Sequence, residues 1–160
     1  MFQAVSLIVI AVLTAVDMFT KHIAATTIKA DGPFEFLFGT FQFRYVENTG
    51  AAFSSFSDNT VLLTVVTAVI LSGCLILLLS KKIKPLFMNI CLLLVVAGGT
   101  GNLIDRIRFG YVIDFIEPLF IDFAVFNFAD CCITVGAIMM IAYEIYELVC
   151  EHKKKAVKNG

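Results

Sequence analysis

Four aspartates lie close to apolar sequence in residues 98–130: Asp105, Asp114, Asp122 and Asp130. This segment leaves one apolar run, crosses a polar stretch and enters another apolar run. A carboxylate at the edge of a membrane span is costly to ionise, so each is by default a candidate functional residue. Two carboxylates that meet in space would have their pKa values pushed apart, which would supply one acid and one base. The segment therefore indicates acid–base chemistry at a membrane boundary.

The residue types alone do not decide which aspartates would form such a pair. Asp114 has apolar neighbours on both sides, which should raise its pKa. Asp130 begins the last apolar run, where a helix N-terminus favours an anion, but the same position fits a helix cap with no other role. Asp105 precedes Arg106, which favours a local ion pair, and Asp122 fits a loop that faces water. The pair Asp114 and Asp130 is thus one of several combinations.

Amide and guanidinium side chains accompany these carboxylates. Asn102 and Arg106 are four residues apart and would share a helix face if the helix continues there. Asn127 lies three residues before Asp130, and Asn48 opens a segment of small residues that equally fits a plain turn. These groups would hold the carboxylates or bind substrate, or would satisfy polar backbone where the spans end.

Two further pairs suggest structural roles. Asp17 and Lys21 are four residues apart, so they predict an ion pair on one helix face, with Lys21 extending towards the membrane interface. We favour this role over direct chemistry. Gly98 and Gly101 are expected where helices pack closely, because small residues let helix backbones approach.

The composition predicts a membrane protein that positions these residues at the ends of helices. The chain is 59% hydrophobic with a mean hydropathy of +0.92, which is too apolar for an ordinary soluble domain. We expect a single membrane domain over residues 1–160. Its predicted spans are residues 4–25, 60–80, 86–102 and 129–149. The first is interpreted as a retained helix and not a signal peptide, because no basic residue precedes it and charged residues interrupt it.

A short polar region between the first two spans predicts strands. Phe41–Tyr45 alternates apolar and polar residues, Phe34–Phe36 begins a similar alternation, and Gly39 and Thr40 lie between them as a turn. The predicted fold class is therefore a membrane all-α protein. It is a bundle of four transmembrane helices with a small extracytoplasmic β-sheet or hairpin.

The distribution of basic residues predicts the orientation. One side of the predicted spans carries Lys81, Lys82, Lys84, Lys153, Lys154, Lys155 and Lys158, and the other carries Lys29, Arg44, Arg106 and Arg108. Cytoplasmic loops carry the excess of basic residues. We therefore expect both termini in the cytoplasm and the aspartates at the outer face.

Some classes of function are not supported. No metal site is predicted, because neither His22 nor His152 has a second ligand at a useful spacing. The five cysteines form no CxxC pair and fit buried apolar positions, although the adjacent Cys131 and Cys132 could react with oxidants. No basic patch with interleaved aromatic residues indicates nucleic-acid binding.

Five short blocks, in order, resemble the lipoprotein signal peptidases, also called signal peptidase II. They are Asp17–Lys21, Asn48–Phe53, Gly101–Arg106 (GNLIDR), Val112–Ile116 (VIDFI) and Phe126–Asp130 (FNFAD). The resemblance implies an aspartic peptidase of the bacterial cytoplasmic (inner) membrane with Asp114 and Asp130 as its catalytic dyad. It implies that the residues supporting the dyad or binding substrate are Asn48, Asn102, Arg106 and Asn127, with Asp17, Lys21, Gly98 and Gly101 nearby.

The resemblance also implies the substrate. It is a prolipoprotein whose cysteine already bears diacylglycerol, cut just before that cysteine, with membrane lipid as the other partner. No cofactor is expected, and the enzyme is expected to be a monomer. Two other classes remain: a proton-coupled transporter, which would need acids at mid-membrane depth, and a non-catalytic assembly factor, which would tolerate Asp114→Asn.

Overall fold

The long apolar runs form four helices that are long and apolar enough to cross a membrane. The computed structural model describes residues 2–50 and 60–159. The four helices are α1 (Phe2–Ile23), α3 (Thr60–Leu79), α4 (Leu86–Phe109) and α5 (Phe128–Asn159). The four predicted spans and the small sheet described below are thus present, and the predicted fold class is confirmed.

Helix α4 is the central helix of the bundle. It packs against α5, α1 and α3, and it is the most buried of the four helices. Its Leu92, Leu93 and Val96 form a core with Ile10 of α1 and Leu78 of α3. The other helices expose many of their apolar side chains, as expected when the surrounding solvent is lipid.

Three of the four predicted spans ended earlier than the helices do, in α4, α5 and the first helix. Helix α4 continues past residue 102 to Phe109, because the polar side chains of its last turns have partners on other elements, as described below. It ends where Gly110 takes a left-handed conformation (φ 80°), which a residue with a Cβ atom adopts less readily. Helix α5 runs beyond residue 149 to Asn159 through a segment rich in lysine, a good helix former.

The first helix also continues beyond its predicted end at residue 25. It passes through a π-helical turn, η1 (Ala24–Ile28), into the short helix α2 (Lys29–Asp31). Ala24 and Ile28 are buried in a second apolar cluster together with Ile113 and Phe115 of the sheet. The helical residues that follow α1 therefore pack against the sheet at the end of the bundle.

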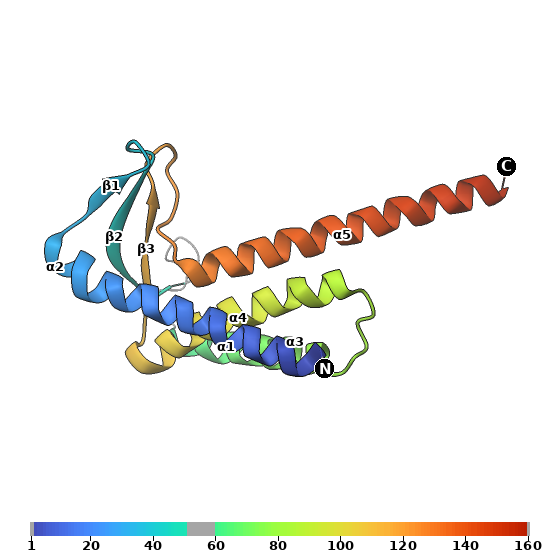
Figure 1. The fold of residues 1–160 in the computed structure, drawn as a ribbon, viewed down its shortest axis with the longest axis horizontal. Coiled ribbons are helices and arrows are strands. Elements are labelled where there is room, and N and C mark those ends of the chain that lie inside the picture. Colours follow the sequence, from blue (N-terminus) through green and yellow to red (C-terminus); the bar gives the residue numbers. More distant parts are fainter. Residues whose placement is uncertain (1, 51–59, 160) are drawn as a thin grey trace.

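The sheet has three antiparallel strands in the order β1–β2–β3. The predicted hairpin is confirmed as β1 (Phe34–Phe36) and β2 (Phe41–Asn48), and the third strand is β3 (Val112–Pro118). Strand β3 was not predicted, because its first four residues are all buried and leave no alternation of apolar and polar positions. The sheet lies at one end of the bundle, and both chain termini lie at the other (Figure 1).

Candidate active site

The start of α5 places Asp130. Asn127 precedes the helix, and its Oδ1 accepts a hydrogen bond from the backbone N–H of Asp130 at 2.9 Å. In return, Asp130 Oδ2 accepts the backbone N–H of Asn127 at 3.1 Å. This reciprocal pair is a capping box, and it fixes the Asp130 carboxylate at the positive end of the helix.

The middle of β3 places Asp114. Its side chain is 2% exposed, and its Oδ2 accepts a hydrogen bond from Asn48 Nδ2 at 2.8 Å. Its Oδ1 accepts one from Asn127 Nδ2 at 2.6 Å. Burial raises the pKa of Asp114 to about 7, with a further raising contribution from the charge of Asp130, although the bonds from Asn48 and Asn127 oppose the shift.

Asn127 therefore joins the two carboxylates directly. It is fully buried, it caps the helix that carries Asp130, and it donates to Asp114. Asn102 of α4 adds a second link, since its Nδ2 donates to Asp130 Oδ1 at 2.8 Å and its Oδ1 accepts from Asn127 at 3.2 Å. The structure thus brings Asp114, Asp130, Asn102 and Asn127 into one hydrogen-bond network.

A buried lysine underlies this network. Lys21 Nζ donates a hydrogen bond to Asn102 Oδ1 at 2.8 Å and forms ion pairs with Asp17 Oδ2 at 2.8 Å and with Asp105 Oδ2 at 2.9 Å. The predicted ion pair with Asp17 is confirmed. The prediction that Lys21 extends to the interface was wrong, because the residue is 2% exposed and its charge is compensated inside the protein.

Asp17 and Asp105, the two carboxylates beside Lys21, also hold the elements that carry Asp114 and Asp130. Asp17 Oδ1 accepts the backbone N–H of Ala129 in α5 at 2.9 Å. Asp105 Oδ2 accepts the backbone N–H of Ile113 in β3 at 3.2 Å. The local ion pair predicted between Asp105 and the following arginines was wrong, since its cationic partner is Lys21.

Arg106 lies on the same face of α4 as Asn102, as predicted for a continuing helix. Its guanidinium is half-buried, donates to the backbone carbonyl of Gly50 at 3.4 Å, and lies within electrostatic reach of Asp130, Asp114 and Asp105. The rest of the predicted block Asn48–Phe53, from residue 51 onward, lies outside the described residues.

Two glycines of α4 let the helices approach at this level. A Cβ atom at Gly98 would meet the carbonyl oxygen of Ala129, and it would lie 2.9 Å from a side-chain carbon of Ile133. A Cβ atom at Gly101 would meet the carboxylate of Asp17. Both predicted close-packing positions are therefore confirmed, and both lie next to residues that position α5.

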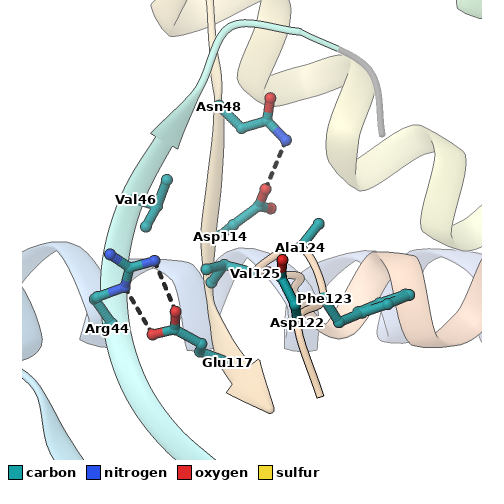
Figure 2. A pocket seen from close by; sticks show the side chains of 9 residues that line it. All are labelled: Arg44, Val46, Asn48, Asp114, Glu117, Asp122, Phe123, Ala124 and Val125. Carbon is teal, nitrogen blue, oxygen red and sulfur yellow. Dashed lines mark hydrogen bonds and ion pairs between the residues drawn. The ribbon is translucent and has the colours of Figure 1, made fainter. Parts of the chain in front are cut away.

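A cavity of about 360 Å³ opens beside Asp114 (Figure 2). Its walls come from β2, β3 and the connection that leads to α5. The lining residues are Arg44, Val46, Asn48, Asp114, Glu117, Asp122, Phe123, Ala124 and Val125. Asp122 was predicted to face water in a loop, and no role was predicted for Glu117. Arg44 lies in the alternating stretch that predicted a strand, whereas no signal in the sequence predicted that the strand continues to Asn48.

The donors around the site do not resemble a metal centre. Within residues 2–50 and 60–159, no group of three His, Cys, Asp or Glu side chains is arranged to hold a metal ion. The two carboxylates differ in a way that suits acid–base chemistry. Asp114 is buried and favours its proton, whereas Asp130 accepts two N–H groups at a helix N-terminus.

Four apolar helices, with Asp114 and Asp130 joined through Asn127 at one end of the bundle, are the arrangement expected of a membrane hydrolase of the aspartic type. Comparison with known proteins agrees. The profile of the family described as signal peptidase (SPase) II matches residues 9–146. The chain therefore belongs to the signal peptidase II family and is an aspartic peptidase.

Curated relatives and solved structures are similar over most of their length. The lipoprotein signal peptidase of Streptococcus thermophilus is 34% identical over 84% of this chain and 88% of its own. That of Caldanaerobacter subterraneus is 38% identical over 84% and 92%, and that of Enterococcus faecalis is 33% identical over 94% and 91%. A bacterial membrane enzyme solved in meso at 2.3 Å superposes with a TM-score of 0.80 at 33% identity, over 91% of this chain and 90% of that one.

Proposed function

We propose that this enzyme removes signal peptides from lipid-modified prolipoproteins, with Asp114 and Asp130 activating water between them. The observation that carries the proposal is the role of Asn127, which donates to Asp114 and caps the helix of Asp130. One buried side chain thus holds the two carboxylates to one site. The names of the curated relatives supply the substrate class.

In the proposed reaction the two carboxylates have different tasks. Asp130 is the base, because the two N–H groups and the helix N-terminus favour its negative charge. Asp114 is the acid, because burial favours its protonated form. Both of its oxygens accept amide donors, and a proton on Oδ2 would remain free to point to a substrate carbonyl.

The steps follow from this division. Water adds to the scissile carbonyl carbon while Asp130 takes one of its protons and Asp114 gives its own proton to the carbonyl oxygen, so that a tetrahedral diol forms. The carbon–nitrogen bond then breaks as Asp130 passes its proton to the leaving amine and Asp114 regains a proton from a diol hydroxyl. The carboxyl group of the signal peptide and the amine of the lipidated cysteine are released. At the start of each cycle the pair shares one proton.

Arg106 and Asn48 are proposed to complete the site. Arg106 lies near both carboxylates without a carboxylate ion pair of its own among the described residues, so it is available to a substrate carbonyl. Asn48 holds Asp114 from the sheet side. Asp17, Lys21 and Asn102 are proposed to position the dyad.

The enzyme is proposed to work as a single-domain monomer in the bacterial inner membrane, with its site at the outer face. The connection between α3 and α4 and both termini lie at the end of the bundle opposite the sheet (Figure 1). That end carries the lysine clusters, which favours the cytoplasm. A reporter enzyme that functions only outside the cytoplasm should be inactive when fused after residue 160.

The direct test uses the purified protein and a diacylglyceryl-modified prolipoprotein, followed by mass spectrometry. The wild type should release the signal peptide, and Asp114→Asn and Asp130→Asn should not, while remaining folded. Asp31→Asn is the matched control, because this exposed carboxylate lies on α2 and does not line the cavity. Cleavage that survives in either dyad variant would show that the chemistry lies elsewhere.

A further inference from the structure

The described residues that line the cavity beside Asp114 come from the sheet and from the connection to α5. Among residues 2–50 and 60–159, none of the lining residues belongs to one of the four apolar helices. The cavity nevertheless reaches Asp114, a carboxylate of the proposed dyad. A polypeptide bound in it would therefore lie within a few residues of the bond that is cut. The inference below rests on the proposed function and names the part of the substrate that the cavity holds.

Two parts of a lipid-modified prolipoprotein do not suit this cavity. The apolar signal segment and the acyl chains would bury hydrocarbon against the charged side chains of Arg44, Glu117 and Asp122. Desolvating such groups without polar partners is unfavourable. Both parts suit the lipid-exposed faces of the helices instead. The part that remains is the polypeptide that follows the lipidated cysteine.

We propose that this cavity binds the first residues of the mature lipoprotein and that its charge selects against acidic residues there. The charge balance follows from the pairing of the lining residues. Arg44 Nε lies 2.7 Å from Glu117 Oε2 and its Nη2 lies 2.8 Å from Glu117 Oε1, so the two charges neutralise each other (Figure 2). Gln42 donates a further hydrogen bond to Glu117.

Asp122 has no such compensation. It is exposed, it lines the cavity from the connection to α5, and it forms no hydrogen bond or ion pair with any residue in the described parts of the chain. With Arg44 and Glu117 neutralised, the carboxylate of Asp122 gives the cavity its negative charge. A lysine or arginine of the substrate would be attracted to Asp122, and a glutamate would be repelled.

The size and reach of the effect are limited. An exposed pair is worth at most about 1 kcal/mol, which corresponds to roughly a fivefold change in rate. An extended chain advances about 3.3–3.6 Å per residue. The preference should therefore be confined to roughly the first three residues after the cysteine and should be absent further along.

The test compares lipidated substrates that differ only in the residue after the cysteine: lysine, glutamine or glutamate. For the wild type, kcat/KM should fall in that order, with about threefold to fivefold between neighbours. Asp122→Asn should reduce the spread, and Asp122→Lys should reverse the order. Asp31→Lys adds the same charge to an exposed position outside the cavity and should leave the order unchanged.

Equal rates for the three substrates with the wild type would overturn this inference while leaving the proposed function intact. The same holds if Asp31→Lys alters the preference as much as Asp122→Lys, since the effect would then be one of overall charge. A preference that persists when the charge is moved eight residues beyond the cysteine would also overturn it. Cleavage of none of the substrates by any form would instead overturn the proposed function.

Discussion

The stability of Asp114→Asn relative to the wild type should increase as the pH rises. Burial raises the pKa of Asp114 to about 7 from its usual value of 3.8. Between these two values the folded state binds a proton that the unfolded state has lost, so the stability of the wild type falls as the pH rises through this window. Asparagine has no charge to desolvate and removes this dependence.

The magnitude follows from the size of the shift. One pKa unit corresponds to about 1.36 kcal/mol, so the ionisation penalty is about 4 kcal/mol at pH 8 and roughly 2 kcal/mol at pH 5. The substitution also has a cost that does not depend on pH. Asn48 and Asn127 each donate to one Asp114 oxygen, and asparagine can accept only one of these bonds, which costs about 1–3 kcal/mol.

The measurement is therefore the difference in Tm between variant and wild type at several pH values, in detergent micelles. A thiol-reactive dye reports unfolding, because Cys91 and Cys132 are buried in the folded protein. Between pH 5 and pH 8 the Tm of the variant minus the Tm of the wild type should increase by about 5–10 °C. Asp122→Asn, at an exposed position, is the control. A difference that stays constant with pH would refute the claim that Asp114 carries this penalty.

Three further predictions concern the same site. Peptidase activity should fall as the pH rises above about 7, because Asp114 loses the proton it donates, and a pH–rate profile still rising at about pH 10 would contradict this. Lys21→Met should lower the free energy of unfolding by about 3–5 kcal/mol by leaving two buried carboxylates unpaired, and adding Asp105→Asn should recover part of the loss in chemical denaturation. Gly98→Ala should lower Tm because its Cβ meets backbone, whereas Gly73→Ala, with open space around it, should leave Tm unchanged or raise it.

The fold was largely predictable because the dominant signals are long and local. Helix α3 carries no charge, and lysines follow it, so its ends were placed within about a residue. The hairpin was predictable from the alternation around Phe41–Tyr45 and the turn before it. Strand β3 was not predictable in this way. It pairs with the distant strand β2, and its first four residues are all buried, so its own sequence shows no alternation of apolar and polar residues.

The site was predictable in its residue types but not in its pairings. Asn102 and Arg106 were expected on one helix face, and Asn127 near Asp130, from spacing alone. The partner of Asp105 was not, because Lys21 is distant in sequence and the nearby arginines offered a simpler pairing. A polar side chain inside an apolar run indicates a buried partner, but only the packing of α1 on α4 identifies it.

The pairings also explain why two asparagines suit this site. An asparagine amide has one accepting and one donating end, and its orientation is set by its neighbours. The ammonium of Lys21 takes the oxygen of Asn102, so its nitrogen must face Asp130. The backbone N–H of Asp130 takes the oxygen of Asn127, so its nitrogen must face Asp114. A buried charge and a helix N-terminus thus aim one donor at each carboxylate before any substrate arrives, and an aspartate at either position would present an acceptor to an acceptor.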